Sequence, residues 1–232
     1  MSHEDPRSDG GVRVGERLRV VRQRIERSGG GEAVRVVAVT KGFGPEAVRA
    51  ALANGLADIG ENYADELVEK ARHFVDDAVA PRWHFLGAIQ RNKIARLAPF
   101  VGSWQGVDRL EEGEAIARRC PGAAVLVEVA TVDRADRPGV GLDAVEALVA
   151  ALRARDLDVR GLMTVAPPVA EDRSATERAF AAVGAMVERL GLAEASMGMS
   201  DDLELAVANG ATMVRVGRAL FGTRPKPSEV AQ

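Results

Sequence analysis

Lys41 is the residue of this sequence with the clearest potential for covalent chemistry. It follows the apolar run at 36–39, whereas most lysines lie on solvated surfaces. Removal from water lowers the pKa of a lysine and exposes a nucleophilic amine, the group that forms a Schiff base with an aldehyde. The alternative is an ordinary lysine that ends a strand and reaches solvent. The position of Lys41 alone leaves both interpretations open.

A second group of chemically suggestive residues lies near the end of the chain. Ser200 is followed by Asp201, Asp202 and a predicted helix, so its hydroxyl could cap that helix or donate to an anion. Gly217 follows Arg215 by two residues, and its missing side chain would let the backbone approach a ligand closely. Taken singly, Ser200 could be a simple N-cap and Arg215 could be one half of a salt bridge.

The chain that carries these residues alternates between two kinds of pattern. Short apolar runs, rich in β-branched residues and typical of buried strands, recur along the sequence. Segments with apolar residues at helical spacing follow them, and one longer such segment precedes the first run. We predict strands at 34–39, 57–59, 83–86, 100–105, 124–129, 159–165, 195–197 and 213–216, and helices or turns at 12–27, 46–54, 63–75, 93–97, 109–118, 143–153, 172–190, 201–209 and 219–221.

This alternation predicts an α/β fold with a parallel sheet. Eight strand–helix units in about 220 residues fit a small (β/α)8 (TIM) barrel. We therefore predict a single barrel domain at 11–224 with an extra N-terminal helix, between disordered tails at 1–10 and 225–232. A doubly wound open sheet is the alternative, but the turn after the first strand lacks the glycine spacing of a dinucleotide-binding loop.

The barrel would bring the two groups of suggestive residues together. Active sites of such barrels lie where the strands end, and phosphate sites often form from the loops after strands seven and eight. Lys41 follows the first predicted strand, whereas Ser200 and Gly217 follow the seventh and eighth. An amine that faces a phosphate site indicates a phosphorylated aldehyde as the cofactor.

Composition and charge exclude several other kinds of chemistry. The 232 residues carry a formal net charge of −3, so nothing indicates a general attraction for nucleic acid. The single cysteine, Cys120, excludes an internal disulfide, and with His3 in a polar terminus a three-histidine zinc site is not expected. The sequence has neither a membrane-length apolar run nor a signal-peptide pattern. We expect a cytoplasmic protein with no metal and no nucleic-acid or membrane partner.

Seven short motifs of this sequence resemble those of one known family. They run in the family order from Lys41 to Gly222 and cover most of the chain. The family is that of the pyridoxal phosphate homeostasis proteins, the YggS-like family, which are single-domain barrels of fold type III. The matching segments are 38–41 (AVTK), 60–63 (GENY), 83–87 (WHFLG), 90–93 (QRNK), 161–163 (GLM), 196–202 (SMGMSDD) and 214–217 (VRVG).

The resemblance implies that pyridoxal 5'-phosphate (PLP) is the cofactor. It implies that Lys41 carries PLP as a Schiff base. It also implies that Ser200 and the backbone of Gly217 and Arg218 bind the phosphate group.

The resemblance also implies contacts around the pyridine ring. By similarity to alanine racemases, Arg215 would face the ring nitrogen and keep it unprotonated, because an arginine does not give up its own proton. The ring would then be a weaker electron sink than one paired with an aspartate. Asn62 would contact the ring substituents, and His84 and Met163 would pack beside the ring.

The sequence departs from the family pattern at five positions near these motifs. Thr40 stands where many relatives have serine, and Gly42 begins an unusual segment after the lysine. Ala88 and Arg91 replace residues that are commonly proline and serine. Glu128 stands where a neutral polar residue is common. These departures bear on loop shape and ligand preference.

Three functions are compatible with this site. A racemase of this fold needs Lys41 on one face of the cofactor and a tyrosine on the other. The single tyrosine, Tyr63, lies beside Asn62, and the sequence leaves no room for the β-rich second domain that supplies this residue in racemases. We therefore favour a PLP carrier or regulator without efficient turnover, a monomer or weak dimer whose candidate partners are apo PLP enzymes. A racemase-like enzyme with weak activity, or a barrel that no longer binds PLP, are the alternatives.

Overall fold

The computed structural model describes residues 6–77, 79–131 and 138–224. Its centre is a closed barrel of parallel strands, since β4 pairs with both β3 and β5. This confirms the (β/α)8 barrel and excludes the open-sheet alternative. In chain order the strands of the ring are β1 (Arg35–Val39), β2 (Asp58–Glu61), β3 (Arg82–Phe85), β4 (Val101–Val107), β5 (Ala124–Ala130), β7 (Asp158–Met163), β8 (Glu194–Ser196) and β9 (Met213–Val216).

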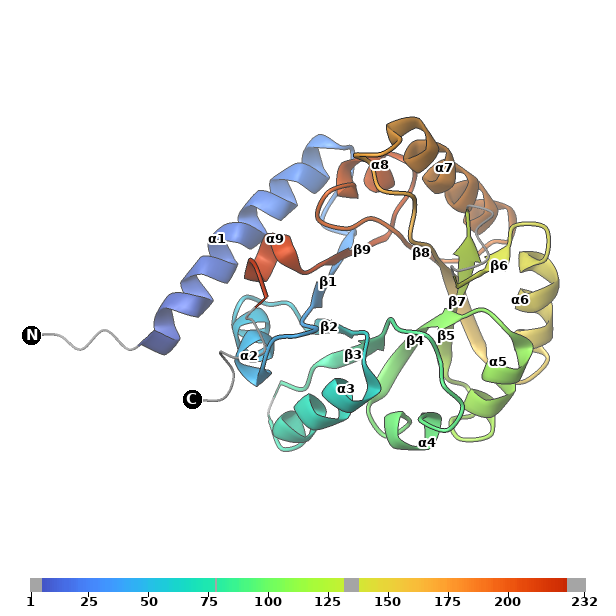
Figure 1. Cartoon of the computed structure of the whole chain (residues 1–232), viewed down its shortest axis with the longest axis horizontal. Helices are drawn as coiled ribbons and strands as arrows, with labels where there is room; N and C mark the ends of the chain where they lie inside the picture. Colours follow the sequence, from blue (N-terminus) through green and yellow to red (C-terminus); the bar gives the residue numbers. More distant parts are fainter. Residues whose placement is uncertain (1–5, 78, 132–137, 225–232) are drawn as a thin grey trace, which may run out of the picture.

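Helices surround this ring, as Figure 1 shows. The first helix, α1 (Pro6–Arg27), precedes the barrel and packs against α2, α8 and α9. It begins six residues before the predicted start, so the boundary predicted at residue 10 falls inside it. Residues 1–5 and the predicted tail at 225–232 lie outside the described residues. The other helices are α2 (Pro45–Ala53), α3 (Ala64–Ala71), α4 (Ile94–Leu97), α5 (Leu110–Ala117), α6 (Val145–Arg153), α7 (Arg173–Arg189), α8 (Leu203–Ala208) and α9 (Arg218–Phe221).

Two local features differ from the sequence-based expectation. A two-residue strand, β6 (Val140–Gly141), pairs with the end of β5, although no strand was predicted there. The predicted helix at 63–75 is divided into α3 and a 3-10 turn at Arg72–Phe74. The second strand also continues through Glu61, two residues beyond its predicted end. Glu61 is therefore a buried residue of a barrel strand and not of the loop that follows.

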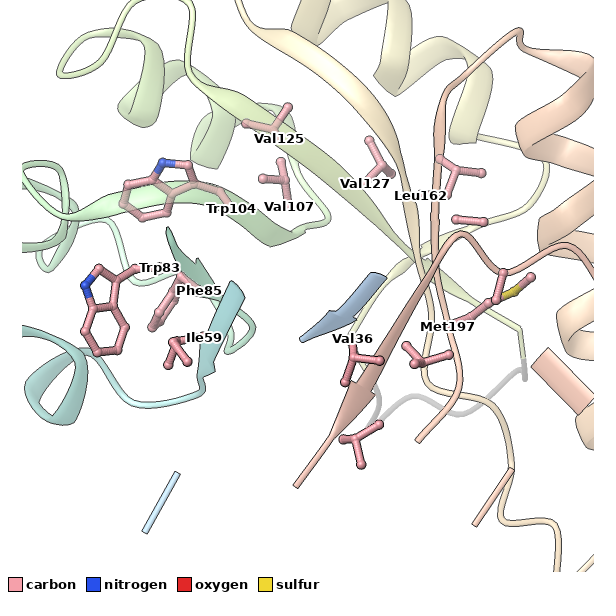
Figure 2. Close-up of a cluster of buried hydrophobic side chains, with 14 of the residues drawn as sticks. Val36, Ile59, Trp83, Phe85, Trp104, Val107, Val125, Val127, Leu162 and Met197 are labelled. Atoms are coloured by element: carbon pink, nitrogen blue, oxygen red, sulfur yellow. The ribbon is translucent and has the colours of Figure 1, made fainter. Parts of the chain in front are cut away.

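The alternation of side chains along β1 explains how the barrel separates its core from its site. Val36 and Ala38 belong to the main apolar cluster, in which strand side chains pack against the helices. Val39 points to the other side and lines the cavity at the carboxyl ends of the strands. Figure 2 shows part of the apolar cluster, with Val36, Ile59, Trp83, Phe85, Trp104, Val107, Val125, Val127, Leu162 and Met197 labelled.

The register of β1 sets the position of Lys41. Val39 pairs with Gly60 of β2, and Ala38 pairs with Val216 of β9. Lys41 therefore follows its strand at the same edge of the sheet where β2 and β9 end. The structure thus places the amine between the loops that carry Asn62 and Gly217.

Candidate functional site

One cavity of about 590 Å³ lies at the carboxyl ends of the strands. It receives side chains from loops that are far apart in sequence, including those after β1, β8 and β9. The structure brings seven of the eight residues predicted for the site to this cavity, and His84 is the exception. The seven are Lys41, Asn62, Met163, Ser200, Arg215, Gly217 and Arg218.

Lys41 lies in this cavity with its side chain partly buried. Its pKa is lowered below the ordinary value, first by burial and then by the positive charges of Arg224 and Arg215. This environment shifts Lys41 toward the neutral amine that Schiff-base chemistry needs and distinguishes it from a fully solvated lysine. Arg224 lines the same cavity and was missed by the sequence analysis, which assigned no role to the residues after the final turn.

A buried network holds the backbone on both sides of Lys41. Lys70 of α3 is 4% exposed, and its Nζ donates to the carbonyl oxygen of Thr40 at 2.8 Å and to Glu61 Oε1 at 2.6 Å. The hydroxyl of Thr40 donates to the same Glu61 oxygen at 2.5 Å. Glu66 Oε2 accepts from Lys70 Nζ and from the amide of Gly42. Residues 40 and 42 are thereby fixed around the lysine between them.

Lys70 was also missed by the sequence analysis. Its spacing from Glu66 is that of an ordinary helical ion pair, i to i+4, which usually indicates a solvated surface. The signal that could have revealed it is Glu61, because a carboxylate in a barrel strand requires a buried partner.

The loops after β8 and β9 are joined by the hydroxyl of Ser200. Its Oγ accepts a hydrogen bond from the amide of Ala219 at 3.1 Å, in the first turn of α9. The alternative of a simple N-cap at Ser200 does not hold, because Asp202 occupies the N-cap position of α8. Since Ser200 accepts this bond, its own hydrogen remains available to a ligand. The side chain of Arg218 pairs with Asp201 across the same two loops.

Gly217 allows β9 to end close against β1. A Cβ atom at this position would lie 3.1 Å from the carbonyl oxygen of Val39, which is closer than most side chains approach a backbone atom. This close approach is to the neighbouring strand, two residues before Lys41. The predicted approach of the Gly217 backbone to a ligand stays a prediction.

Arg215 is buried inside the barrel at the base of the cavity. Its guanidinium donates to the carbonyl oxygens of Ser196, at 2.6 Å, and Thr164, at 2.7 Å. Burial lowers the pKa of Arg215 to about 10, which still leaves it charged at neutral pH. None of the described carboxylates forms an ion pair with it, so the salt bridge considered as an alternative is absent from the described part of the chain.

His84 does not line the cavity and belongs to a chain of hydrogen bonds below it. Its Nε2 lies 2.8 Å from Asp58 Oδ1, and its Nδ1 lies 2.8 Å from Gln105 Nε2. Gln105 Oε1 accepts from the Ser196 hydroxyl, which in turn accepts from Arg215. Because Gln105 donates to Nδ1, His84 carries its proton on Nε2. The packing beside the ring predicted for His84 is therefore replaced by an indirect connection to Arg215.

Asp58 anchors the far end of this chain. Burial works to raise its pKa, but hydrogen bonds from His84 and Arg82 outweigh burial and hold the pKa well below its usual range. Asp58 is therefore a carboxylate at neutral pH. The chain thus connects a fixed negative charge on β2 with the fixed positive charge of Arg215 on β9.

Comparison with known proteins identifies the family of this barrel. Residues 13–225 match the family model described as the N-terminal domain of alanine racemase. A protein of Pseudomonas aeruginosa, named pyridoxal phosphate homeostasis protein, is 39% identical over 198 residues, which are 82% of this chain and 85% of that protein. A protein of the same name from Deinococcus radiodurans is 40% identical and covers 81% of this chain and 88% of its own length. The chain belongs to the pyridoxal phosphate homeostasis protein family.

Solved structures agree with this membership. PipY of Synechococcus elongatus, solved with PLP bound, is 30% identical, covers 90% of this chain and all of that chain, and superimposes with a TM-score of 0.76. A protein described as unknown from Bifidobacterium adolescentis has a TM-score of 0.81 at 27% identity, over 95% of this chain and 98% of that one. Alanine racemase from E. faecalis, at 20% identity and a TM-score of 0.71, shares the fold over 59% of its own length.

Four of the five departures from the pattern of the pyridoxal phosphate homeostasis protein family fall into two places. Thr40 and Gly42 belong to the network that holds the Lys41 loop. Ala88 and Glu128 line a second, smaller cavity of about 270 Å³. Arg91 is exposed and lines neither of these two cavities. These four departures therefore change the hydrogen-bond network around Lys41 and the lining of the smaller cavity.

Two further searches of the described residues were negative. No helix among them is long and apolar enough to span a membrane. No group of three or more histidine, cysteine, aspartate or glutamate side chains within the described ranges could hold a metal ion.

Proposed function

We propose that this protein binds PLP in the larger cavity, attached to Lys41 as a Schiff base, and serves as a carrier or regulator in intracellular PLP homeostasis. The observation that carries this proposal is the shared cavity. An amine with a lowered pKa faces the same space as Ser200, Gly217 and Arg218. The names of the relatives, and the PLP in PipY, support the choice of cofactor.

The residues present fit each part of PLP. The aldehyde requires a neutral amine, which the environment of Lys41 favours. The phosphate requires donors, which the free hydrogen of Ser200 and the backbone amides of Gly217 and Arg218 would supply. The ring nitrogen would face Arg215, whose guanidinium is fixed by two backbone carbonyls. Bound PLP supplies an aldehyde that reacts reversibly with amines, and an electron-withdrawing ring.

We further propose that the protein does not turn over amino acids at an enzymatic rate. A racemase would need a second proton-transfer group opposite Lys41. Tyr63 is 57% exposed and lines a different small cavity together with Lys93. A cationic Arg215 at the ring nitrogen also disfavours electron withdrawal by the ring. These features support transfer of PLP to apo-enzymes over catalysis.

The attachment is tested by reduction of the PLP-loaded protein with borohydride, followed by peptide mapping. The wild-type protein is expected to carry the label on Lys41. Lys41→Ala should lose the label and keep its fold, because the side chain is only partly buried. Lys93→Ala is the matched control and should keep the label, since Lys93 pairs with Asp65 outside the larger cavity. A label on another lysine in the Lys41→Ala variant would refute the assignment.

The absence of efficient turnover is tested with amino acids in deuterated solvent. L-alanine, D-alanine and L-serine are incubated with the loaded protein, and deuterium at the α carbon is measured. Exchange at about 1–1000 per second, the ordinary range of enzymes, would overturn the carrier proposal. The proposal expects negligible exchange, together with transfer of PLP to an apo-enzyme faster than from free PLP in buffer.

A further inference from the structure

The smaller cavity contains a buried carboxyl group without a partner. Glu128, at the end of β5, is 6% exposed and lines this space of about 270 Å³. No side chain or backbone amide of the described residues is found to donate a hydrogen bond to its carboxylate. The hydroxyl of Thr131, which lines the same cavity, is also buried without a partner among those residues. Buried polar groups normally have hydrogen-bond partners, so two such groups facing one cavity indicate that the cavity accepts a polar ligand.

Charged groups on three neighbouring segments act on Glu128 without binding it. Arg215 of β9 attracts the carboxylate but lies beyond ion-pair distance, and its guanidinium hydrogen bonds go to Ser196 and Thr164. Asp108 and Glu112, which follow β4, repel it. Burial, the largest influence, and these two acids raise the pKa of Glu128 to about 7, against the effect of Arg215. Glu128 is therefore a carboxyl group whose ionised form a bound cation would stabilise.

The rest of the lining defines what kind of cation fits. Asn62 and Thr131 are the other side chains with polar groups, and the described lining includes no lysine, arginine or histidine. A ligand that carries its own carboxylate would therefore find no cationic side chain among the described lining residues to receive it. The remaining surface is small and mostly apolar, which suits a short hydrocarbon body. The lining residues of this kind are Leu86, Ala88, Val129, Ala130, Pro138 and Val165.

We propose that this cavity is a subsite for a small primary amine that lacks a carboxylate, and that Glu128 binds its ammonium group. The two cavities adjoin, because Asn62, Leu86 and Val165 line both. The amine would thus lie beside the larger cavity that contains Lys41. Thr131 would orient it through its hydroxyl group.

The position of the subsite gives it a role that rests on the proposed function. With PLP joined to Lys41, the amine nitrogen would bond to the carbon held by Nζ, and the bond from that carbon to Nζ would break. Starting from a protonated Schiff base, the incoming ammonium gives up two protons, the first of them to Glu128 before its nitrogen can form the bond, and both end on Nζ, so Lys41 leaves as an ammonium group and nothing is oxidised or reduced. Glu128 is suited to accept and return a proton during this exchange. A small amine would thereby release PLP from the protein.

Binding is tested first on the protein without PLP, by calorimetry at pH 8 with n-propylamine as the probe. The wild-type protein should bind n-propylamine at least tenfold more tightly than L-alanine, and should not bind propanoate. Glu128→Gln should lose at least about tenfold in affinity for n-propylamine, as expected for a hydrogen bond to a charged group. Glu114→Gln removes the same charge from a surface ion pair with Arg155 and should bind as the wild type does. Equal binding of n-propylamine and L-alanine would overturn the proposal.

A second variant and a second readout separate this inference from the proposed function. Thr131→Val should weaken n-propylamine binding less than Glu128→Gln, so the test survives if one variant folds poorly. Lys41→Ala should keep n-propylamine binding while losing covalent PLP. In the loaded wild type, n-propylamine should release PLP faster than L-alanine, and Glu128→Gln should remove that preference. Amine binding that depends on Glu128 in a protein that takes no PLP would refute the proposed function and leave the subsite standing. Unchanged binding in Glu128→Gln would overturn the subsite alone.

Discussion

The ends of β2 and β5 each carry a buried glutamate, and the two have opposite surroundings. Glu61 is fully buried, and its Oε1 accepts hydrogen bonds from Lys70 and Thr40. Glu128 is 6% exposed and receives no hydrogen bond from the described residues. Burial raises the pKa of both groups, but Lys70 opposes that effect at Glu61 through its charge and its hydrogen bond.

The contrast shows how the same residue type can support a site in one place and form one in another. Glu61 is held through Oε1 in a network whose members fix the backbone around Lys41, and Lys70 balances its charge, although its Oε2 is buried without a hydrogen bond from the described residues. The carboxylate of Glu128 faces a cavity and is available to a ligand. A buried charge without a partner is costly, and such a cost is typical of functional sites.

The largest effect is expected from the network. Lys70→Met leaves Glu61 buried without its cation and should cost about 3–5 kcal/mol of unfolding free energy. The measurement is urea denaturation at pH 7. Lys93→Met, which removes an exposed ion pair between α4 and α3, is the control and should change the midpoint little. Equal losses in the two variants would remove the distinction between the buried and exposed lysines.

The same network should also determine how well Lys41 binds PLP. Since Lys70 and Glu66 fix residues 40 and 42, Lys70→Met should also weaken PLP attachment under conditions where the variant remains folded. Adding Glu61→Gln to Lys70→Met should recover part of the stability, because the unpaired charge is then removed. It should not recover PLP attachment, since the hydrogen bond from Lys70 to the Thr40 carbonyl is still missing.

The next largest effect is expected from Glu128→Gln, which should stabilise the protein at high pH, whereas Lys70→Met should destabilise it. Its folded-state pKa of about 7 exceeds the ordinary 4.5, so its contribution to stability is complete below about pH 4.5 and is lost as pH rises through 7. Glu128→Gln cannot ionise and should therefore gain on the wild type as pH rises. At about 1.4 kcal/mol per pKa unit, the gain should reach about 3 kcal/mol above pH 7. Thermal unfolding from pH 4 to 8 measures it, and a constant difference across that range would contradict the assignment.

A smaller effect is expected at Ser200. Its hydroxyl oxygen already accepts a hydrogen bond, as Glu61 does, whereas its hydrogen is available to a ligand, as the Glu128 carboxylate is. Ser200→Ala should weaken PLP binding by about 1.5–3 kcal/mol, the value of a hydrogen bond to a charged group. Binding of pyridoxal, which lacks the phosphate, should change far less. An equal loss for the two ligands would place the phosphate elsewhere. The unpaired amide of Ala219 should cost the protein about 1 kcal/mol more in stability.

The sequence by itself determined the barrel and most of its site. Strand and helix patterns are local, and the eight apolar runs predicted the ring with small boundary differences because burial on both faces demands continuous apolar residues. Lys41, Ser200 and Gly217 could be found because strand ends meet at one edge of a parallel barrel. Motifs then indicated PLP.

Only the tertiary structure decided which polar groups find partners. Ser200 caps the turn after β9 instead of its own helix, and His84 reaches Arg215 through Gln105 and Ser196, because loops and strands far apart in sequence meet there. In sequence Lys70 resembles a surface lysine, but in the structure α3 brings its ammonium group to the carbonyl of Thr40, next to Lys41. Glu128 stood out in sequence only as an unusual residue. Its lack of a partner depends on everything packed around it, which no local pattern records.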